Sequence, residues 1–499
     1  MELNRRKFLT CSALTVGDIG LRAHAAPLRH QHRKPNVLLL MSDQHKRSCM
    51  GACGDQVART PNLDRLAATS VRFTDAYCTN PVCTPSRASL MTGLYSHHFE
   101  AQDNTRPYSP THKTLAHHFN EAGYFTALIG KMHWVDAQSH GFEYRVEFND
   151  WFQYLGPKTK IYANELGQPN SGAGQPEIDD LWREAGDPWK GTRELDDREG
   201  SVAVGRVSRL EERDHFDSFV ARESIRFLKE HGTKDEPFFL VSSFLRPHDP
   251  FMPAERFAKM FRPADMTLPR SWGKADMKAL PLEVRRSILR NGPTPELADE
   301  NEAKKRMAFY YANLAEMDSC LGQVVKAIED LNLDRDTIIC YTSDHGEMLG
   351  DLGLWAKFQF YEGSCGVPLM IKVPGVQRGV CSVPVSLVSF SATIADLCGI
   401  QQVTPNDGVT FAGLVRSPNS SASYGPIFAE YSLSTKAAKY MIRQGNSKYT
   451  FWTHDLPELY DLRTDPEELH NLASVPEHAN EASRLKQGLF AWHRPAEMT

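Results

Sequence analysis

The sequence predicts an α/β fold with a doubly wound, mostly parallel sheet and a smaller C-terminal α+β domain. Four largely apolar runs, at residues 37–41, 124–129, 238–244 and 337–343, are typical of strands buried on both faces of a parallel sheet. Helical patterns lie between them, at residues 62–68, 114–122 and 306–331. Strands that alternate with helices indicate a doubly wound sheet.

The individual elements carry their own signals. The first strand is the continuous apolar run from Val37 to Met41, and Gly123 ends the helix that begins near Thr114. The longest helix carries apolar residues at helical spacing: Phe309, Leu314, Met317, Leu321, Val324, Val325 and Ile328. After about residue 400, short strand-like pieces at 439–443 and 448–452 and a final helix over roughly 479–493 predict the smaller domain.

We therefore expect three parts: a signal peptide with linker at 1–33, the main domain at 34–400, and the smaller domain at 401–499, with antiparallel strands and a terminal helix. Between about 150 and 210 the sequence is rich in Gly, Pro and charge, with scattered aromatic residues. A loop this long inside a compact domain is usually a functional lid or insertion, so we expect an insertion there.

The N-terminus has the anatomy of an export signal. The basic stretch Asn4-Arg5-Arg6-Lys7 precedes a short apolar segment and an Ala23-His24-Ala25 site, and paired arginines are typical of the twin-arginine route. Asp18 interrupts the apolar segment, so a basic terminus without a targeting role is the alternative. The signal predicts a periplasmic or secreted protein.

The composition excludes several classes of protein. The chain has 499 residues, 41% hydrophobic and 24% charged, which is ordinary for a globular enzyme and unlike a disordered chain. A net charge of −5, from 57 basic and 62 acidic residues, argues against nucleic-acid binding through a basic surface. Beyond the N-terminus no apolar stretch approaches about 18 residues, so we expect no stable membrane insertion. Ten cysteines are too sparse for a disulfide scaffold, and pairing of Cys49 with Cys53 is left open.

Chemically active residues follow each of the four buried strands. The strands run into Asp43, into Gly130-Lys131-Met132-His133, into Arg246-Pro247-His248-Asp249, and into Asp344-His345-Gly346. Ligands of open α/β sheets bind beyond the carboxyl ends of the strands. Any one of these residues is explained by a polar exit from the core, but four together favour an active site with a divalent cation.

A cysteine motif adds a further component, Cys83-Thr84-Pro85-Ser86-Arg87-Ala88-Ser89-Leu90-Met91-Thr92-Gly93. Pro85 fits the first position of a helix and Gly93 its end, which places Cys83 at a helix N-terminus that favours an anion. From local physics, Cys83 is either a thiolate nucleophile with a low pKa or a small buried residue.

The motif resembles the signature of the type I, formylglycine-dependent sulfatases of the alkaline phosphatase superfamily. Further stretches are similar, in the family's order: Lys34-Pro35-Asn36, Gly130-Lys131-Met132-His133, Ser343-Asp344-His345-Gly346-Glu347, Gly353-Leu354-Trp355-Ala356-Lys357 and Glu458-Leu459-Tyr460-Asp461-Leu462. The resemblance spans about residues 34–475. It implies an alkaline phosphatase-like sheet, a catalytic domain at 34–400, and hydrolysis of a sulfate monoester of a small molecule or saccharide.

The resemblance also implies roles for individual residues. The family's motif cysteine, here Cys83, is oxidised to Cα-formylglycine by a formylglycine-generating enzyme, and its hydrated form attacks sulfur. Five residues are implied as ligands of a divalent cation: Asp43, Gln44, Cys83, Asp344 and His345. The resemblance implies that Arg87 holds the hydrated nucleophile and that Lys131 and Lys357 neutralise the charge of the sulfuryl group. It implies that His133 orients the nucleophile and that His248 protonates the leaving oxygen.

Two positions depart from the commonest sulfatase pattern. Many sulfatases have Asp-Asp and Asp-Asn where this chain has Asp43-Gln44 and Asp344-His345, and these versions look like choline sulfatases and phosphonate monoester hydrolases. We expect Ca²⁺, with Mn²⁺ or another divalent ion as the alternative, since imidazole accepts softer metals. A phosphonate or phosphate ester hydrolase on the same scaffold is the alternative function. A catalytically inactive relative that binds sulfated glycans is the third hypothesis.

Weaker candidates have ordinary explanations beside functional ones. Asp103-Asn104 is either a turn or a substrate contact like that of choline sulfatases. Six residues are candidates for a substrate pocket or for anchors of a long loop: Trp134, Asp136, His140, Trp151, Trp182 and Trp189. The pairs His97-His98 and His117-His118 are interpreted as surface or loop histidines.

Overall fold

The computed structural model describes residues 34–99, 102–104, 112–134, 138–165, 205–289, 299–401, 406–420, 424–433 and 435–494. The predicted signal peptide, most of the predicted insertion, and the candidates Asp136, Trp182 and Trp189 lie outside these ranges. From Pro35 onward the chain forms one compact unit. No helix in the described ranges combines the length and hydrophobicity that crossing a bilayer requires.

In the described ranges, nine strands form the main sheet, in the order β4-β3-β5-β1-β6-β7-β2-β8, with β9 paired to β2. The strands are β1 (Asn36–Asp43), β2 (Val71–Tyr77), β3 (Phe125–Gly130), β4 (Tyr144–Val146), β5 (Phe238–Pro247), β6 (Thr337–Ser343), β7 (Gly366–Lys372), β8 (Gly379–Cys381) and β9 (Val385–Ser386). Strand β7 runs antiparallel to β6 and β2, and the other pairs are parallel. The predicted mostly parallel sheet is confirmed.

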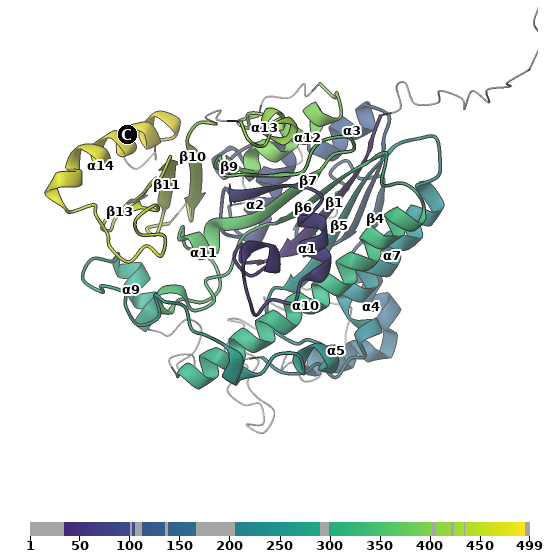
Figure 1. Cartoon of the computed structure of the whole chain (residues 1–499), viewed down its shortest axis with the longest axis horizontal. Coiled ribbons are helices and arrows are strands. Elements are labelled where there is room, and N and C mark those ends of the chain that lie inside the picture. The colour runs from purple at the N-terminus through teal and green to yellow at the C-terminus, as the bar shows by residue number, and fades with distance from the viewer. Residues whose placement is uncertain are drawn as a thin grey trace, which may run out of the picture. The chain divides into compact units, whose positions relative to one another are not determined.

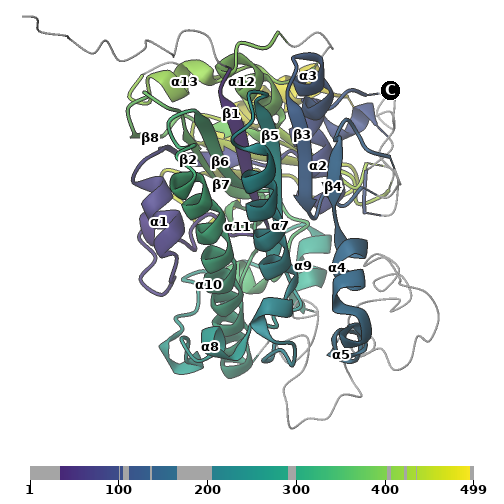
Figure 2. The ribbon, with the colours of Figure 1, turned by 90° about the vertical axis from the view of Figure 1, so that its right-hand side faces the viewer.

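Helices cover both faces of this sheet (Figures 1 and 2). Leu38 and Leu40 of β1 pack in one core with α7 (Phe216–His231) and α10 (Glu300–Asp330). Val37 and Leu39, which point the other way, pack in a second core with α2 (Cys83–Thr92), α3 (Leu115–Glu121) and α12 (Phe390–Leu397). Because successive side chains alternate between faces, a strand covered on both sides is apolar at every position.

The predicted helices are present with small differences at their ends. The helix expected at 62–68 is α1 (Pro61–Ala67). The longest helix begins at Glu300, earlier than the expected 306, because the carboxylate of Asp299 accepts hydrogen bonds from the backbone N–H groups of Asn301 and Glu302 and caps it. The other described α-helices that precede the second sheet are α4 (Phe148–Leu155), α5 (Thr159–Glu165), α8 (Glu255–Ala258), α9 (Leu282–Leu289), α11 (Glu362–Cys365) and α13 (Ala412–Arg416).

A second sheet follows in the chain. It is antiparallel and contains β10 (Ile427–Tyr431), β11 (Lys439–Gln444), β12 (Ser447–Trp452) and β13 (Glu458–Asp461). Helix α14 (Ala479–Trp492) packs on it through Leu485 and Leu489. These elements agree with the expected C-terminal α+β texture, and the boundary at residue 400 stays a prediction.

Candidate active site

The four predicted strands are neighbours, in the order β3-β5-β1-β6. Asp43 is the last residue of β1, while Lys131 and His248 directly follow β3 and β5, and Asp344 directly follows β6. Because these strands are parallel, their carboxyl ends meet at one edge of the sheet. The residues chosen from the strand ends therefore lie together.

Helix α2 brings the cysteine to this edge. Cys83 is its first residue, all ten of its residues are buried, and Gly93 ends it with a left-handed φ of 77°. Pro85 is the third residue and not the first, a position still within the turn whose N–H groups lack helical partners. Asn104 helps to cap the helix, because its Oδ1 accepts a hydrogen bond from the N–H of Thr84 at 3.1 Å.

The thiol of Cys83 is surrounded by cationic groups. Its Sγ lies 3.0 Å from Nζ of Lys357, 3.3 Å from Nε2 of His345 and 4.0 Å from Nζ of Lys131. The side chain of His133 also hydrogen-bonds it. Burial alone raises the pKa of the Cys83 thiol, but the nearby lysines and His345 outweigh burial and bring that pKa well below its usual value.

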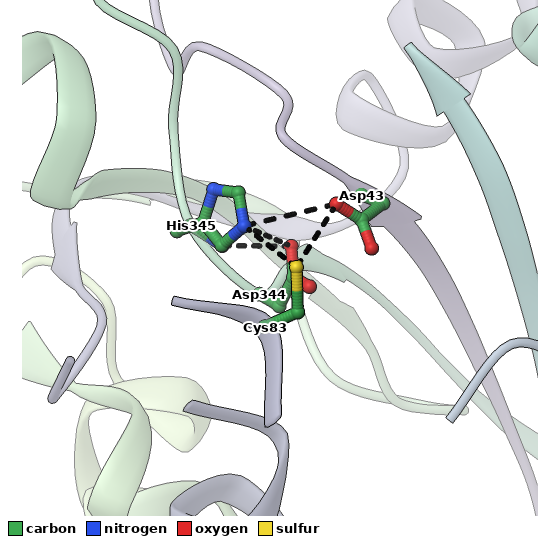
Figure 3. Close-up of side chains that lie close together, drawn as sticks. All are labelled: Asp43, Cys83, Asp344 and His345. Carbon is green, nitrogen blue, oxygen red and sulfur yellow. Dashed lines mark hydrogen bonds and ion pairs between the residues drawn. The ribbon is translucent and has the colours of Figure 1, made fainter. Parts of the chain in front are cut away.

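Cys83 belongs to a buried cluster that offers metal ligands. One ligand atom from each of Asp43, Cys83, Asp344 and His345 lies within 4.8 Å of the other three. Figure 3 shows Asp43, Cys83 and the consecutive Asp344 and His345 converging, with the imidazole of His345 turned toward the carboxylates and the sulfur. Two carboxylates, an imidazole and the side chain of residue 83 form a mixed set of ligands that suits a divalent cation.

Arg87 holds the two carboxylates of this cluster. Its Nη2 lies 2.9 Å from Oδ2 of Asp43, and its Nε lies 2.7 Å from Oδ2 of Asp344. Its Nη1 donates to the carbonyl of Lys131 and to the hydroxyl of Ser243. Arg87 is fully buried, and these bonds direct its guanidinium to the two acids of the cluster, whereas the resemblance implied contact with the nucleophile.

Gln44 is also compatible with cation binding. Its Oε1 is buried and has no hydrogen-bond partner among the described residues, while its Nε2 donates to two carboxylates. A buried carbonyl oxygen without a donor is costly unless a cation or water satisfies it. The backbone N–H of Gln44 also donates to Oδ1 of Asp344, at 3.2 Å.

Lys357 also contacts His248, which lies beside Asp43. Nζ of Lys357 lies 2.9 Å from Nε2 of His248, and His248 Nε2 lies 3.8 Å from Oδ1 of Asp43. Burial by itself lowers the pKa of Lys357, but the charges of Cys83 and Asp43 raise that pKa above its usual value. The side chain of Lys357 is therefore protonated and positively charged. The site therefore has fixed positive charge around one nucleophilic position, as transfer of an anionic group requires.

Residues without an assigned role also take part. Glu347 and Asp249 accept the amide N–H bonds of Gln44, and Ser243 accepts a bond from Arg87. Glu347 lies in the Asp-His-Gly-Glu stretch and Asp249 in the turn after β5, so both lay inside motifs already selected. Their role depends on contacts between distant segments, which sequence spacing does not reveal.

Two of the weaker candidates, Trp134 and Trp151, belong to the hydrophobic cores. Trp134 stacks near His140, with ring centroids 4.3 Å apart, and Trp151 is buried in the core, where its Nε1 donates to the carbonyl of Asp214. Trp151 therefore anchors the main domain. Cys49 and Cys53 are free thiols and do not pair.

The histidine pairs are not surface residues throughout, as the sequence interpretation had assumed. His118 is buried on α3. His97 lies partly buried with its Nδ1 2.9 Å from Oε2 of the buried Glu430. The interpretation was wrong for His118, which lies on the buried face of α3, whereas His97 is partly covered by Glu430 of β10.

Comparisons with known proteins agree with this geometry. The sulfatase family model matches residues 35–400, and the model for the C-terminal region of N-sulphoglucosamine sulphohydrolase matches residues 350–494. The choline-sulfatase of Rhizobium meliloti (strain 1021) is 32% identical over 89% of this chain and 83% of that protein. The arylsulfatase of Clostridium perfringens (strain 13 / Type A) is 28% identical over 92% of this chain and 94% of its own.

Solved structures give the same result. The phosphonate monoester hydrolase of Agrobacterium radiobacter aligns with a TM-score of 0.76 and 25% identity, covering 92% of this chain and 95% of that chain. A protein solved with D-glucosamine-2-N,6-O-disulfate aligns with a TM-score of 0.71, and at 21% identity it supports the fold alone. Fold and site together define a hydrolase of the alkaline phosphatase superfamily. The chain belongs to the sulfatase family and is a sulfuric ester hydrolase.

Proposed function

We propose that this protein hydrolyses a sulfate monoester to an alcohol and inorganic sulfate, using formylglycine at position 83 and one divalent cation. The observation that carries the proposal is the position of Cys83. Its Sγ is at the start of a buried helix, within 4.0 Å of two lysines and beside a cluster of cation ligands. Transfer of an anionic sulfuryl group depends on such pre-placed positive charge.

The surroundings of Cys83 fit the proposed formylglycine. The side chain is fully buried, and its Sγ lies within 4.0 Å of polar groups of Asp43, Lys131, His345 and Lys357, which are able to hydrogen-bond oxygen. When hydrated, formylglycine supplies one hydroxyl that attacks sulfur and a second whose deprotonation releases sulfate. A formylglycine-generating enzyme would act on the Cys83–Arg87 motif.

The same region fits a divalent cation. Asp43, Gln44, Asp344 and His345, with residue 83, would hold it. When bound, the cation lowers the pKa of a coordinated hydroxyl and polarises the sulfate oxygens. We expect Ca²⁺ first, and the imidazole of His345 keeps Mn²⁺ as the alternative.

The remaining roles follow from the contacts. Lys131 and Lys357 lie within 4.0 Å of residue 83 and would neutralise the charge of the sulfuryl group. His133, which hydrogen-bonds the Cys83 side chain, would orient the nucleophile. His248 would give its Nε2 proton to the leaving oxygen as the S–O bond breaks.

Arg87 receives a different role from the one that the resemblance implied. Its bonds to Asp43 and Asp344 occupy one oxygen of each carboxylate, and they leave the other oxygen, Oδ1, toward the cluster. We assign Arg87 to fixing the acidic ligands in place.

The test is a sulfate-release assay on the full chain, produced with a formylglycine-generating enzyme. Choline sulfate, aryl sulfates and sulfated sugars are compared for the wild type and for Cys83→Ala. We expect release from at least one class and nearly none from the variant, because the change removes the nucleophile and little packing. Mass spectrometry of the peptide containing residue 83 should show an aldehyde, and a fully thiol peptide in active enzyme would contradict the proposal.

Two residues of the site and two similarities to known proteins support a second candidate function. The site has Gln44 and His345, and the phosphonate monoester hydrolase of Agrobacterium radiobacter shares its fold over 92% of this chain. The multifunctional alkaline phosphatase superfamily protein PehA of Trinickia caryophylli is also 28% identical. Hydrolysis of a phosphonate or phosphate ester is therefore measured beside sulfate release.

A further inference from the structure

The amide of Gln44 is held in one orientation. Gln44 is fully buried, and its Nε2 lies 2.5 Å from Oε2 of Glu347 and 3.1 Å from Oδ1 of Asp249. Ionised carboxylates accept hydrogen bonds and donate none, so the NH₂ side of the amide must face them. The guanidinium of Arg306 lies near both carboxylates and supplies compensating positive charge. The carbonyl Oε1 of Gln44 is consequently turned away from both acids.

The backbone of Gln44 is held as firmly as its side chain. Its φ of 64° lies in the left-handed region, which is unfavourable for a residue other than glycine. Its N–H donates to Oδ1 of Asp344, and its carbonyl accepts the hydroxyl of Tyr310 at 3.0 Å. The backbone is therefore fixed. A turn of the amide about its Cγ–Cδ bond, which would exchange Oε1 and Nε2, is opposed by the hydrogen bond to Glu347.

The other oxygen of Glu347 contacts a different part of the site. Its Oε1 accepts the backbone N–H groups of Ala356 at 2.6 Å and Leu349 at 3.0 Å. Ala356 and Phe358, which flank Lys357, both have left-handed φ values, 60° and 79°. An anchored backbone is needed to keep such a turn, and this turn brings Nζ of Lys357 to 3.0 Å from Cys83.

We propose that Glu347 is a positioning residue, which directs the carbonyl oxygen of Gln44 to the divalent cation and anchors the turn that carries Lys357. This inference rests on the cation site of the proposed function. A buried glutamate that only stabilises the fold needs hydrogen-bond donors of any kind. Among the described residues, its hydrogen bonds from Gln44, Leu349 and Ala356 all come from Gln44 or the segment 349–356, beside the charge of Arg306.

The variant Glu347→Gln separates the two sides of the carboxylate. Two backbone N–H groups face one side, so the single oxygen of the new amide stays there and its NH₂ faces Gln44. Two NH₂ groups cannot share a hydrogen bond, so only Asp249 is left to hold the amide of Gln44, and its carbonyl oxygen is no longer fixed toward the cation. Loss of such an outer partner typically lowers metal affinity by about 10- to 100-fold.

The experiment measures Mn²⁺ affinity of the metal-free full chain in four variants: wild type, Glu347→Gln, Gln44→Glu and the double variant. In the Gln44 background we expect Glu347→Gln to weaken Mn²⁺ binding at least about tenfold. In the Gln44→Glu background the same change should strengthen it, because a glutamate at 44 repels Glu347 but accepts a hydrogen bond from the amide. Opposite effects of Glu347→Gln on Mn²⁺ affinity in the two backgrounds are not additive, and such non-additivity indicates direct contact between residues 44 and 347.

The control is Glu458→Gln. Glu458 is also buried and accepts bonds from neutral donors, Tyr361, Trp452 and Tyr460, far along the chain from the cation ligands. We expect this variant to bind Mn²⁺ like the wild type. If Glu347→Gln does not fold, the comparison of Gln44→Glu with the double variant decides, and the double variant should bind Mn²⁺ more tightly.

A loss of affinity in both backgrounds, or no change in either, overturns the role of Glu347 and leaves the proposed function intact. Wild-type protein that binds neither Mn²⁺ nor Ca²⁺, or binds them equally well after Asp344→Asn, overturns the cation site of the proposed function and this inference with it.

Discussion

Nζ of Lys357 lies 2.9 Å from Nε2 of His248, on the border of the Cys83 site. Nδ1 of His248 lies 2.5 Å from the backbone carbonyl of Asp249, and because a carbonyl only accepts, Nδ1 carries a hydrogen. Nε2 is therefore the atom that faces the site. When a substrate binds, its leaving oxygen can replace Nζ of Lys357 as the partner of Nε2. In this arrangement Nε2 accepts a hydrogen bond from the Lys357 ammonium, so Nε2 must take up a proton before it can act as the proposed acid.

The first prediction concerns this proton. His248→Ala should lower kcat/KM at least about 100-fold for alkyl sulfates and less than about tenfold for nitrophenyl sulfate, because a good leaving group needs little protonation. Steady-state kinetics on the two substrate types measure the difference. Equal losses on both would remove His248 from the role of acid.

A second prediction concerns the cation. Asp344→Asn removes one charged ligand and one ion-pair partner of Arg87, so both metal content and activity should fall. Elemental analysis of purified protein gives the metal content. Asp318→Asn is the matched control, since Asp318 is also buried but bonds to Asn62 and Leu63. Full activity in protein without any divalent metal would show that the cation site is wrong.

A third prediction uses a buried lysine outside the active site. Burial lowers the pKa of Lys439 from 10.5 to about 7, although its Nζ donates to Oε1 of Gln359 and lies 4.2 Å from the ring centre of Trp452. Between pH 7 and 10.5 the unfolded chain binds more protons than the folded one. Stability therefore rises with pH in this window.

Lys439→Met removes this dependence. The free energy of unfolding of the wild type minus that of the variant should rise by up to about 1.4 kcal/mol per pH unit between pH 7 and 10. Denaturant unfolding at several pH values measures it, with Lys326→Met, at an exposed lysine, as the control. A difference that stays constant with pH would contradict the prediction.

The fourth prediction concerns substrate preference. The best sulfate monoester should exceed the best phosphonate monoester in kcat/KM at least about tenfold, or about 1.4 kcal/mol of transition-state stabilisation. Both esters carry one negative charge, but a phosphonate presents carbon where a sulfate presents a third oxygen. In a site lined by Lys131, Lys357 and His133, that carbon leaves a buried donor unpaired. Kinetics with matched leaving groups test this, and a phosphonate preference would favour the second function.

Some of this architecture could be predicted from the sequence because its signals are local. Strands β1, β3, β5 and β6 are covered on both faces and read as apolar runs. Strand β2 escaped notice because Arg72, Thr74 and Asp75 are only partly buried, which breaks the run. The antiparallel β7 depends on pairing with β6 and β2, contacts that no local pattern specifies.

The site divides in the same way. Cys83, Asp43 and Asp344 stand in motifs or at strand ends, where residue type and position suffice to select them. The bonds of Arg87 to both acids and of Glu347 to Gln44 join segments that are distant in sequence. Their function depends on which atom faces which partner, and only the folded arrangement determines that.

The burial of helix α2 has a consequence for biosynthesis. All ten residues from Cys83 to Thr92 are enclosed, and the side chain of Cys83 has no exposed surface. An enzyme that oxidises Cys83 needs the surrounding segment extended and accessible, a state that the finished protein does not offer. The proposed maturation at position 83 therefore belongs to the interval between translation and the closing of the sheet over α2. Under this proposal, we expect a chain that folds before it meets the maturing enzyme to stay inactive.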